Sequence, residues 1–136
     1  MLQLVCRWCT VVHMTHARYQ RGFRKLIVWQ EAHCLTKMIY KITVSFPKSE
    51  MYEMTKQLRN ASSSIGAQIA EGSQMRTQPH RKLYYERAYS SASEVDNFLE
   101  LSLDLNYLKE DEYKKLLHQV NKVSYLLQHL RDSPNA

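Results

Sequence analysis

The chain has 136 residues, of which 44% are hydrophobic and 24% charged, and its formal net charge is +6. This length allows one domain with a single core and is too short for two. No apolar run approaches the roughly 18 residues that a transmembrane helix needs, and Arg7 interrupts the first apolar stretch, so we expect neither a membrane span nor a signal peptide. The three cysteines, an odd number without a disulfide spacing pattern, favour a reducing cytoplasm.

The positive charge is concentrated near the N-terminus. Residues 1–25 hold five arginine and lysine side chains and no acidic one, whereas the remaining 14 basic residues face 13 acidic residues. Residues 1–24 also lack a sustained apolar periodicity. We therefore expect a basic, poorly ordered N-terminal extension over residues 1–24, followed by a nearly neutral domain over residues 25–132.

Two amphipathic helices are predicted in the first half of this domain. Apolar residues recur at steps of three and four over Leu26–Ser45, and Pro47 ends this helix because the residue before a proline disfavours the helical conformation. The second helix is expected to begin near Ser49 as its cap, with an apolar stripe that starts at Met51. Gly72 is expected to end it in the left-handed conformation that glycine adopts easily.

Two further helices are predicted in the second half. The third starts near Pro79, a residue suited to a first helical turn, and Asn106 takes the left-handed position after it. The fourth has the clearest three–four alternation, from Tyr113 to Leu130, and three acidic residues from Glu110 onward suit the positive end of its dipole. Four helices with short connections predict an all-α fold, an antiparallel up-down-up-down four-helix bundle.

Three segments carry a family resemblance: Leu26–Ala32, Gln57–Gly72 and Asn106–Tyr113. In this order and spacing they resemble the small bacterial four-helix-bundle proteins encoded in intervening sequences of the large-subunit ribosomal RNA gene. The second segment departs from the family pattern at Gly66, where proline is usual, and at Gln68, where asparagine is usual. The N-terminal extension has no counterpart in that pattern.

The resemblance implies a homopentamer, a ring of bundles with a central channel, without enzymatic activity or a cofactor. For members associated with ribosomal RNA it suggests an RNA-binding role. A related accessory protein of diversity-generating retroelements forms such a basic barrel and binds a reverse transcriptase and nucleic acid.

A cluster of basic residues is predicted at one end of the bundle. An up-down arrangement brings together the start of the first helix, the turn between the second and third, and the end of the fourth. Arg81 and Lys82 lie in the first turn of a helix, where cations oppose the dipole, so an anionic partner such as phosphate would explain them. The predicted nucleic-acid-binding residues are Arg24, Lys25, Arg76, Arg81, Lys82 and Arg87, with His80 and Arg131 nearby.

Tyrosines accompany this cluster. Tyr84 and Tyr89 are candidates for stacking on unpaired bases, whereas the helical position of Tyr85 favours packing in the core or at a subunit interface. The alternative for the basic residues is a solvated charged end that binds nothing in particular.

Glu71 lies in the last turn of the second helix, where the dipole disfavours a carboxylate, so we expect a cationic partner. Arg59 and Arg76 are the candidates, within one subunit or across a ring interface, and a structural ion pair is favoured over a catalytic carboxylate. No second acid or histidine is spaced to work with Glu71.

Four potential zinc ligands, Cys6, Cys9, His13 and His16, lie in the N-terminal extension. Only three residues separate Cys9 from His13, far fewer than the twelve or so of a zinc finger, so we expect no metal site.

These observations predict a cytoplasmic, non-enzymatic, homo-oligomeric bundle that binds RNA or a ribonucleoprotein through its basic cluster. The alternative is a protein-binding adaptor, such as an accessory subunit of a reverse transcriptase.

Overall fold

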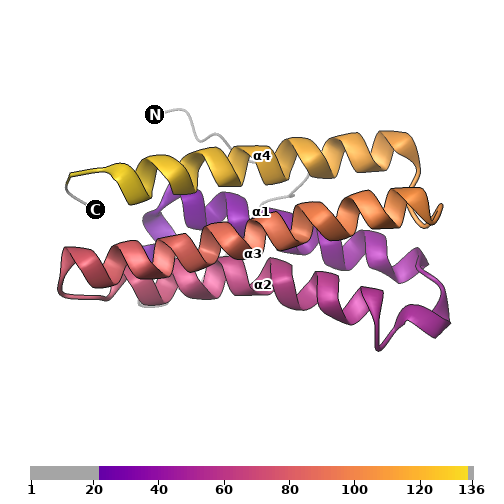
Figure 1. Cartoon of the computed structure of the whole chain (residues 1–136), viewed down its shortest axis with the longest axis horizontal. Helices are drawn as coiled ribbons and strands as arrows, with labels where there is room; N and C mark the ends of the chain where they lie inside the picture. Colours follow the sequence, from indigo (N-terminus) through magenta and orange to yellow (C-terminus); the bar gives the residue numbers. More distant parts are fainter. Residues whose placement is uncertain (1–21, 135–136) are drawn as a thin grey trace, which may run out of the picture.

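The computed structural model describes residues 22–134, and all regular structure in this range is helical (Figure 1). Residues 1–21, most of the expected extension, lie outside the described residues, as do residues 135 and 136. No helix in the described range is both long enough and apolar enough to cross a membrane. In chain order the elements are η1 (Gly22–Lys25), α1 (Ile27–Ile42), η2 (Thr43–Ser45), η3 (Lys48–Glu50), α2 (Met54–Ser73), α3 (Gln78–Asp104) and α4 (Glu110–Asp132).

The four long helices form a bundle in which successive helices run in opposite directions (Figure 1). Each helix packs against its chain neighbour, and α4 closes the bundle against α1. The predicted four-helix bundle is therefore confirmed.

The core consists of the apolar seams that the sequence predicts. Leu35, Ile65, Val95 and Val123, one from each helix, are fully buried. Met51 is an exception, because 52% of its surface is exposed and it lies in the turn before α2 rather than in a helix.

The connection between α1 and α2 differs from the expectation. The chain passes through η3, and α2 begins at Met54, so Ser49 is not its cap. The carboxylate of Glu50 instead accepts hydrogen bonds from the Met54 N–H at 3.2 Å and from the Tyr107 hydroxyl at 2.9 Å. This carboxylate thus ties the start of α2 to the α3–α4 turn, a long-range contact that local sequence patterns do not reveal.

Gly72 is required for a different reason from the one predicted. It lies inside α2 with a negative φ, so the left-handed end predicted for it is wrong. A Cβ atom at this position would lie 2.8 Å from the Tyr84 Cβ and 2.9 Å from the Tyr85 Cε1. The glycine therefore permits the close approach of α2 and α3 near their connecting turn.

The turn before α4 follows the prediction closely. Asn106 has a φ of 59°, the left-handed conformation expected for it. The Glu112 carboxylate then accepts a hydrogen bond of 2.9 Å from the Lys109 backbone N–H, which caps the first turn of α4.

Candidate nucleic-acid interface

Three separate segments meet at one end of the bundle: η1, the turn between α2 and α3, and the end of α4 (Figure 1). The Gln78 side chain donates a hydrogen bond of 2.9 Å to the Pro134 carbonyl and so joins the start of α3 to the chain after α4. The structure therefore brings the predicted basic residues to one end. We call this surface, which carries Arg24, Lys25, Arg76, His80, Arg81, Lys82, Arg87 and Arg131, the basic end.

The basic end carries a net positive charge. Seven arginine and lysine side chains face three carboxylates, Glu71, Glu86 and Asp132. The Arg131 Nε donates a hydrogen bond of 2.8 Å to the Asp132 Oδ1, and this contact is the main reason that the pKa of Asp132 lies below its usual range. Arg76 is exposed in the turn itself. The opposite end holds Glu50, Glu53, Glu100, Asp104, Glu110, Asp111 and Glu112.

Arg81 has a structural role that the sequence argument missed. Its Nη1 donates hydrogen bonds to the carbonyls of Met75 at 3.0 Å and Arg76 at 3.3 Å. These carbonyls follow the end of α2, where backbone acceptors have no partner within the helix. A cation in the first turn of α3 is thus explained by stabilisation of the preceding turn, and no phosphate is needed to account for it.

The tyrosines divide between packing and exposure. Tyr85 is 3% exposed, which confirms the expected packing role, and burial raises its pKa. Tyr84 and Tyr89 are half-buried, and each has an arginine over its ring: Arg87 at 5.4 Å and Arg131 at 5.8 Å from the ring centroids. Their outward faces are therefore occupied in part by cations of the basic end.

Arg59 and Glu71 do not pair within one subunit. They lie on the same helix, twelve residues or about 18 Å apart along its axis. The Arg59 Nε instead donates a hydrogen bond of 2.8 Å to the Thr43 hydroxyl, and its guanidinium carbon lies 4.7 Å from the centroid of the Tyr40 ring. An ion pair of these residues across a subunit interface stays a prediction.

A buried polar network joins α1 and α4, and sequence reasoning did not identify it. Glu31 is 2% exposed, and its carboxylate accepts hydrogen bonds of 2.8 Å from both Gln119 and Lys122. The Gln119 amide also donates to the Glu31 backbone carbonyl at 3.0 Å. These partners lie about 90 residues away along the chain, so only an acidic residue within the apolar seam of α1 could have indicated them.

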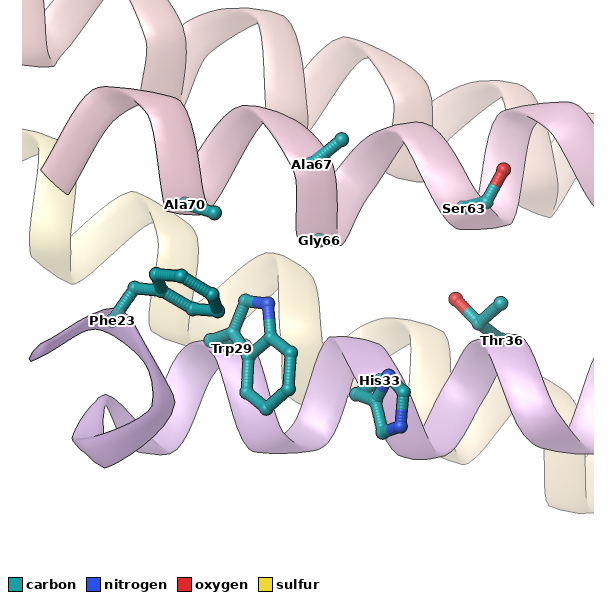
Figure 2. Close-up of a pocket in the computed structure, with 8 residues that line it drawn as sticks. All are labelled: Phe23, Trp29, His33, Thr36, Ser63, Gly66, Ala67 and Ala70. Atoms are coloured by element: carbon teal, nitrogen blue, oxygen red, sulfur yellow. The ribbon is translucent and has the colours of Figure 1, made fainter. Parts of the chain in front are cut away.

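An open groove of about 410 Å³ runs between η1, α1 and α2 (Figure 2). One wall presents Phe23, Trp29 and His33, and the other presents small side chains that include Ser63 and Ala70. The rings of Trp29 and His33 stack with centroids 4.9 Å apart, and partial burial, aided by Lys37, lowers the pKa of His33. The groove therefore suits an apolar partner better than a phosphate group.

Within residues 22–134 no group of three or more histidine, cysteine or acidic side chains is placed to hold a metal ion. The candidate ligands Cys6, Cys9, His13 and His16 lie outside the described residues.

Comparison with known proteins decides the family. A family model described as 23S rRNA-intervening sequence protein matches residues 24–129. The chain belongs to this family. The match covers all four helices apart from the last residues of α4, which confirms the resemblance found in the sequence motifs.

The solved structure of another protein has the same fold as this chain. It is a protein of unknown function from the S23 ribosomal protein family of Bacteroides thetaiotaomicron, with a TM-score of 0.71 and 23% sequence identity. The likeness covers 79% of this chain and 100% of that one. The sequence has no match among curated proteins.

The departures from the family pattern in α2 can now be placed. Gly66 lines the groove, and a Cβ atom there would approach the Trp29 Nε1 at 3.6 Å, an ordinary contact. The Gln68 Oε1 is buried without a hydrogen-bond partner in the described part of the chain. Position 66 therefore has room for a Cβ atom, and Gln68 leaves a buried polar atom unsatisfied.

Proposed function

We propose that this intervening-sequence protein is a non-enzymatic RNA-binding protein that contacts RNA or a ribonucleoprotein in the cytoplasm through its basic end. The observation that carries this proposal is the convergence of cations from η1, the α2–α3 turn and α3 on one end of an otherwise nearly neutral bundle. The description of the family as proteins of the 23S rRNA intervening sequence supports RNA as the anion.

The contacts are proposed to be electrostatic. Arginine and lysine side chains bind phosphate oxygens and release counterions, which gives affinity without reading the base sequence. Arg24, Lys25, Arg76, Lys82 and Arg87 supply these contacts, and Arg81 positions the turn that carries Arg76. Tyr84 and Tyr89 add stacking on unpaired bases only where the neighbouring arginines move aside.

Self-association is a second part of the proposal. A homo-oligomer, for which we propose a pentamer, repeats the basic end once in each subunit. Several weak phosphate contacts on one assembly then act together, because each contact after the first is effectively intramolecular. A single bundle with a net charge of +4 at this end would bind RNA only weakly at physiological salt.

The test is a pair of charge reversals with a matched control. Arg76→Glu combined with Lys82→Glu should weaken binding to a structured RNA about tenfold or more at low salt, because two phosphate contacts are lost and replaced by repulsion. Lys109→Glu combined with Lys114→Glu makes the same change in charge at the opposite end and should leave the affinity within about twofold of wild type. Equal losses from both pairs would refute the proposed site.

A further inference from the structure

The groove of Figure 2 lies between α1 and α2, and beyond it the Arg59 guanidinium of α2 lies over the Tyr40 ring of α1. On α1 the residues on this side, Trp29, His33, Thr36 and Tyr40, follow steps of four, three and four. On α2 the corresponding residues are Arg59, Ser63, Gly66 and Ala70, with the same steps. Such spacing places each set on one helical face. The surface is thus one strip between two helices, apolar at the η1 end and closed by an arginine at the other.

Two contacts within the subunit hold the Arg59 side chain in place. Thr43 accepts a hydrogen bond from its Nε, and Tyr40 supports the plane of its guanidinium. Among the described residues, Arg59 hydrogen-bonds through Nε alone, so both Nη groups remain available. A guanidinium fixed in this way loses little side-chain freedom on binding and matches a carboxylate with two parallel hydrogen bonds.

The surroundings of this strip specify the chemistry of its partner. Glu31 is the sole acidic residue of α1, and it is buried against Lys122. The exposed charges of α1 are Lys37 and Lys41. Tyr40 is 47% exposed beside Arg59. The cations Arg59, Lys37 and Lys41 favour an acidic partner helix, and the apolar end of the strip favours one with exposed apolar side chains.

The second half of α3 has this composition. Between Arg87 and Lys109 the sequence contains no basic residue. Leu101 and Leu105 are 41% and 45% exposed, and the carboxylates of Glu94 and Asp104 are exposed on the same helix or at its end. The chain thus carries both a basic, aromatic strip and an acidic, apolar helix surface.

We propose that the strip between α1 and α2 binds the second half of α3 from another copy of this chain, with Arg59 paired to one of its carboxylates. Two different surfaces meet in this contact, so the interface is heterologous and can close into a ring. The inference rests on the self-association in the proposed function and names its surface, which is distinct from the basic end.

Light scattering on purified full-length protein tests this proposal. Wild type should be larger than the 16.1 kDa single chain, and Arg59→Glu and Leu101→Glu should each reduce the mass to that of one chain while far-UV circular dichroism is unchanged. Lys114→Glu reverses an exposed charge on α4 and should keep the wild-type mass. A mixture of the Arg59→Glu and Leu101→Glu proteins should form dimers, because one intact strip and one intact α3 surface remain.

The outcomes separate the two proposals. An oligomeric wild type whose mass neither variant changes overturns the proposed surface and leaves self-association standing. A wild type that is monomeric at all concentrations overturns the proposed surface and self-association together. The strip would then bind an acidic helix of another protein. A wild type that does not bind RNA at low salt, with the masses as expected, would overturn the RNA proposal alone.

Discussion

Replacement of Gly72 by alanine should destabilise the bundle. The new methyl group would lie 2.8 Å from the Tyr84 Cβ, 2.9 Å from the Tyr85 Cε1 and 3.3 Å from the Tyr85 Cδ1. Tyr85 is 3% exposed, so its ring cannot move into solvent, and the Tyr84 Cβ is fixed to the backbone of α3. Helices α2 and α3 would have to separate near their connecting turn.

Two opposing contributions determine how much Gly72→Ala changes the free energy of unfolding. Overpacking of a well-packed interior costs about 1–3 kcal/mol, and contacts this short place Gly72→Ala near the upper value. Replacement of glycine by alanine inside a helix returns about 1 kcal/mol. We therefore expect the free energy of unfolding to fall by about 1–2 kcal/mol.

Gly66 offers the matched control on the same helix. A Cβ atom there meets the Trp29 Nε1 at 3.6 Å, an ordinary contact, so Gly66→Ala should raise the free energy of unfolding by about 0.5–1 kcal/mol. Urea unfolding followed by far-UV circular dichroism, with all proteins at one concentration, measures both changes. If Gly72→Ala is as stable as wild type, the close approach of α2 and α3 does not explain this glycine.

Three further predictions concern other parts of the bundle. Lys122→Met should lower the free energy of unfolding by about 1–3 kcal/mol, because the buried Glu31 carboxylate loses a charged hydrogen-bond donor, and a double-mutant cycle with Glu31→Gln should show coupling between the two sites. The hydrogen bond to Glu100 raises the pKa of Tyr113 from 10.0 to about 12, so the folded state keeps this proton longer than the unfolded state. Stability from this bond should therefore be lost as pH rises from about 10 to about 12, and Tyr113→Phe should show a smaller loss in chemical denaturation at those pH values. Arg81→Met should lower the free energy of unfolding in urea by about 1 kcal/mol, because the Met75 and Arg76 carbonyls lose a hydrogen-bond donor. A variant as stable as wild type would show that Arg81 does not stabilise this turn.

The helices could be predicted because their determinants are local. The three–four spacing of apolar residues identifies each seam, and Asn106 marks the turn before α4. The cap predicted at Ser49 and the left-handed conformation predicted for Gly72 were wrong, since both positions depend on contacts between distant segments. Glu50 accepts a hydrogen bond from Tyr107 in the α3–α4 turn, and Tyr84 and Tyr85 of α3 leave no room for a side chain at position 72.

The candidate site could be predicted in part. Helix directions alone place the cations of η1, the α2–α3 turn and α3 at one end. The role of Arg81 could not be predicted, because its acceptors are carbonyls of a turn whose conformation the sequence does not specify. The same holds for Arg59, whose partners Thr43 and Tyr40 are brought near only by the packing of α1 on α2.

RNA binding measured across a salt series tests the central claim most directly, with the mass of the protein recorded in the same buffers. We predict that the logarithm of the association constant falls linearly with the logarithm of salt concentration, and that Arg76→Glu with Lys82→Glu reduces the slope by about 1 or more. An affinity independent of salt, or a slope unchanged in this variant, would contradict binding through the basic end.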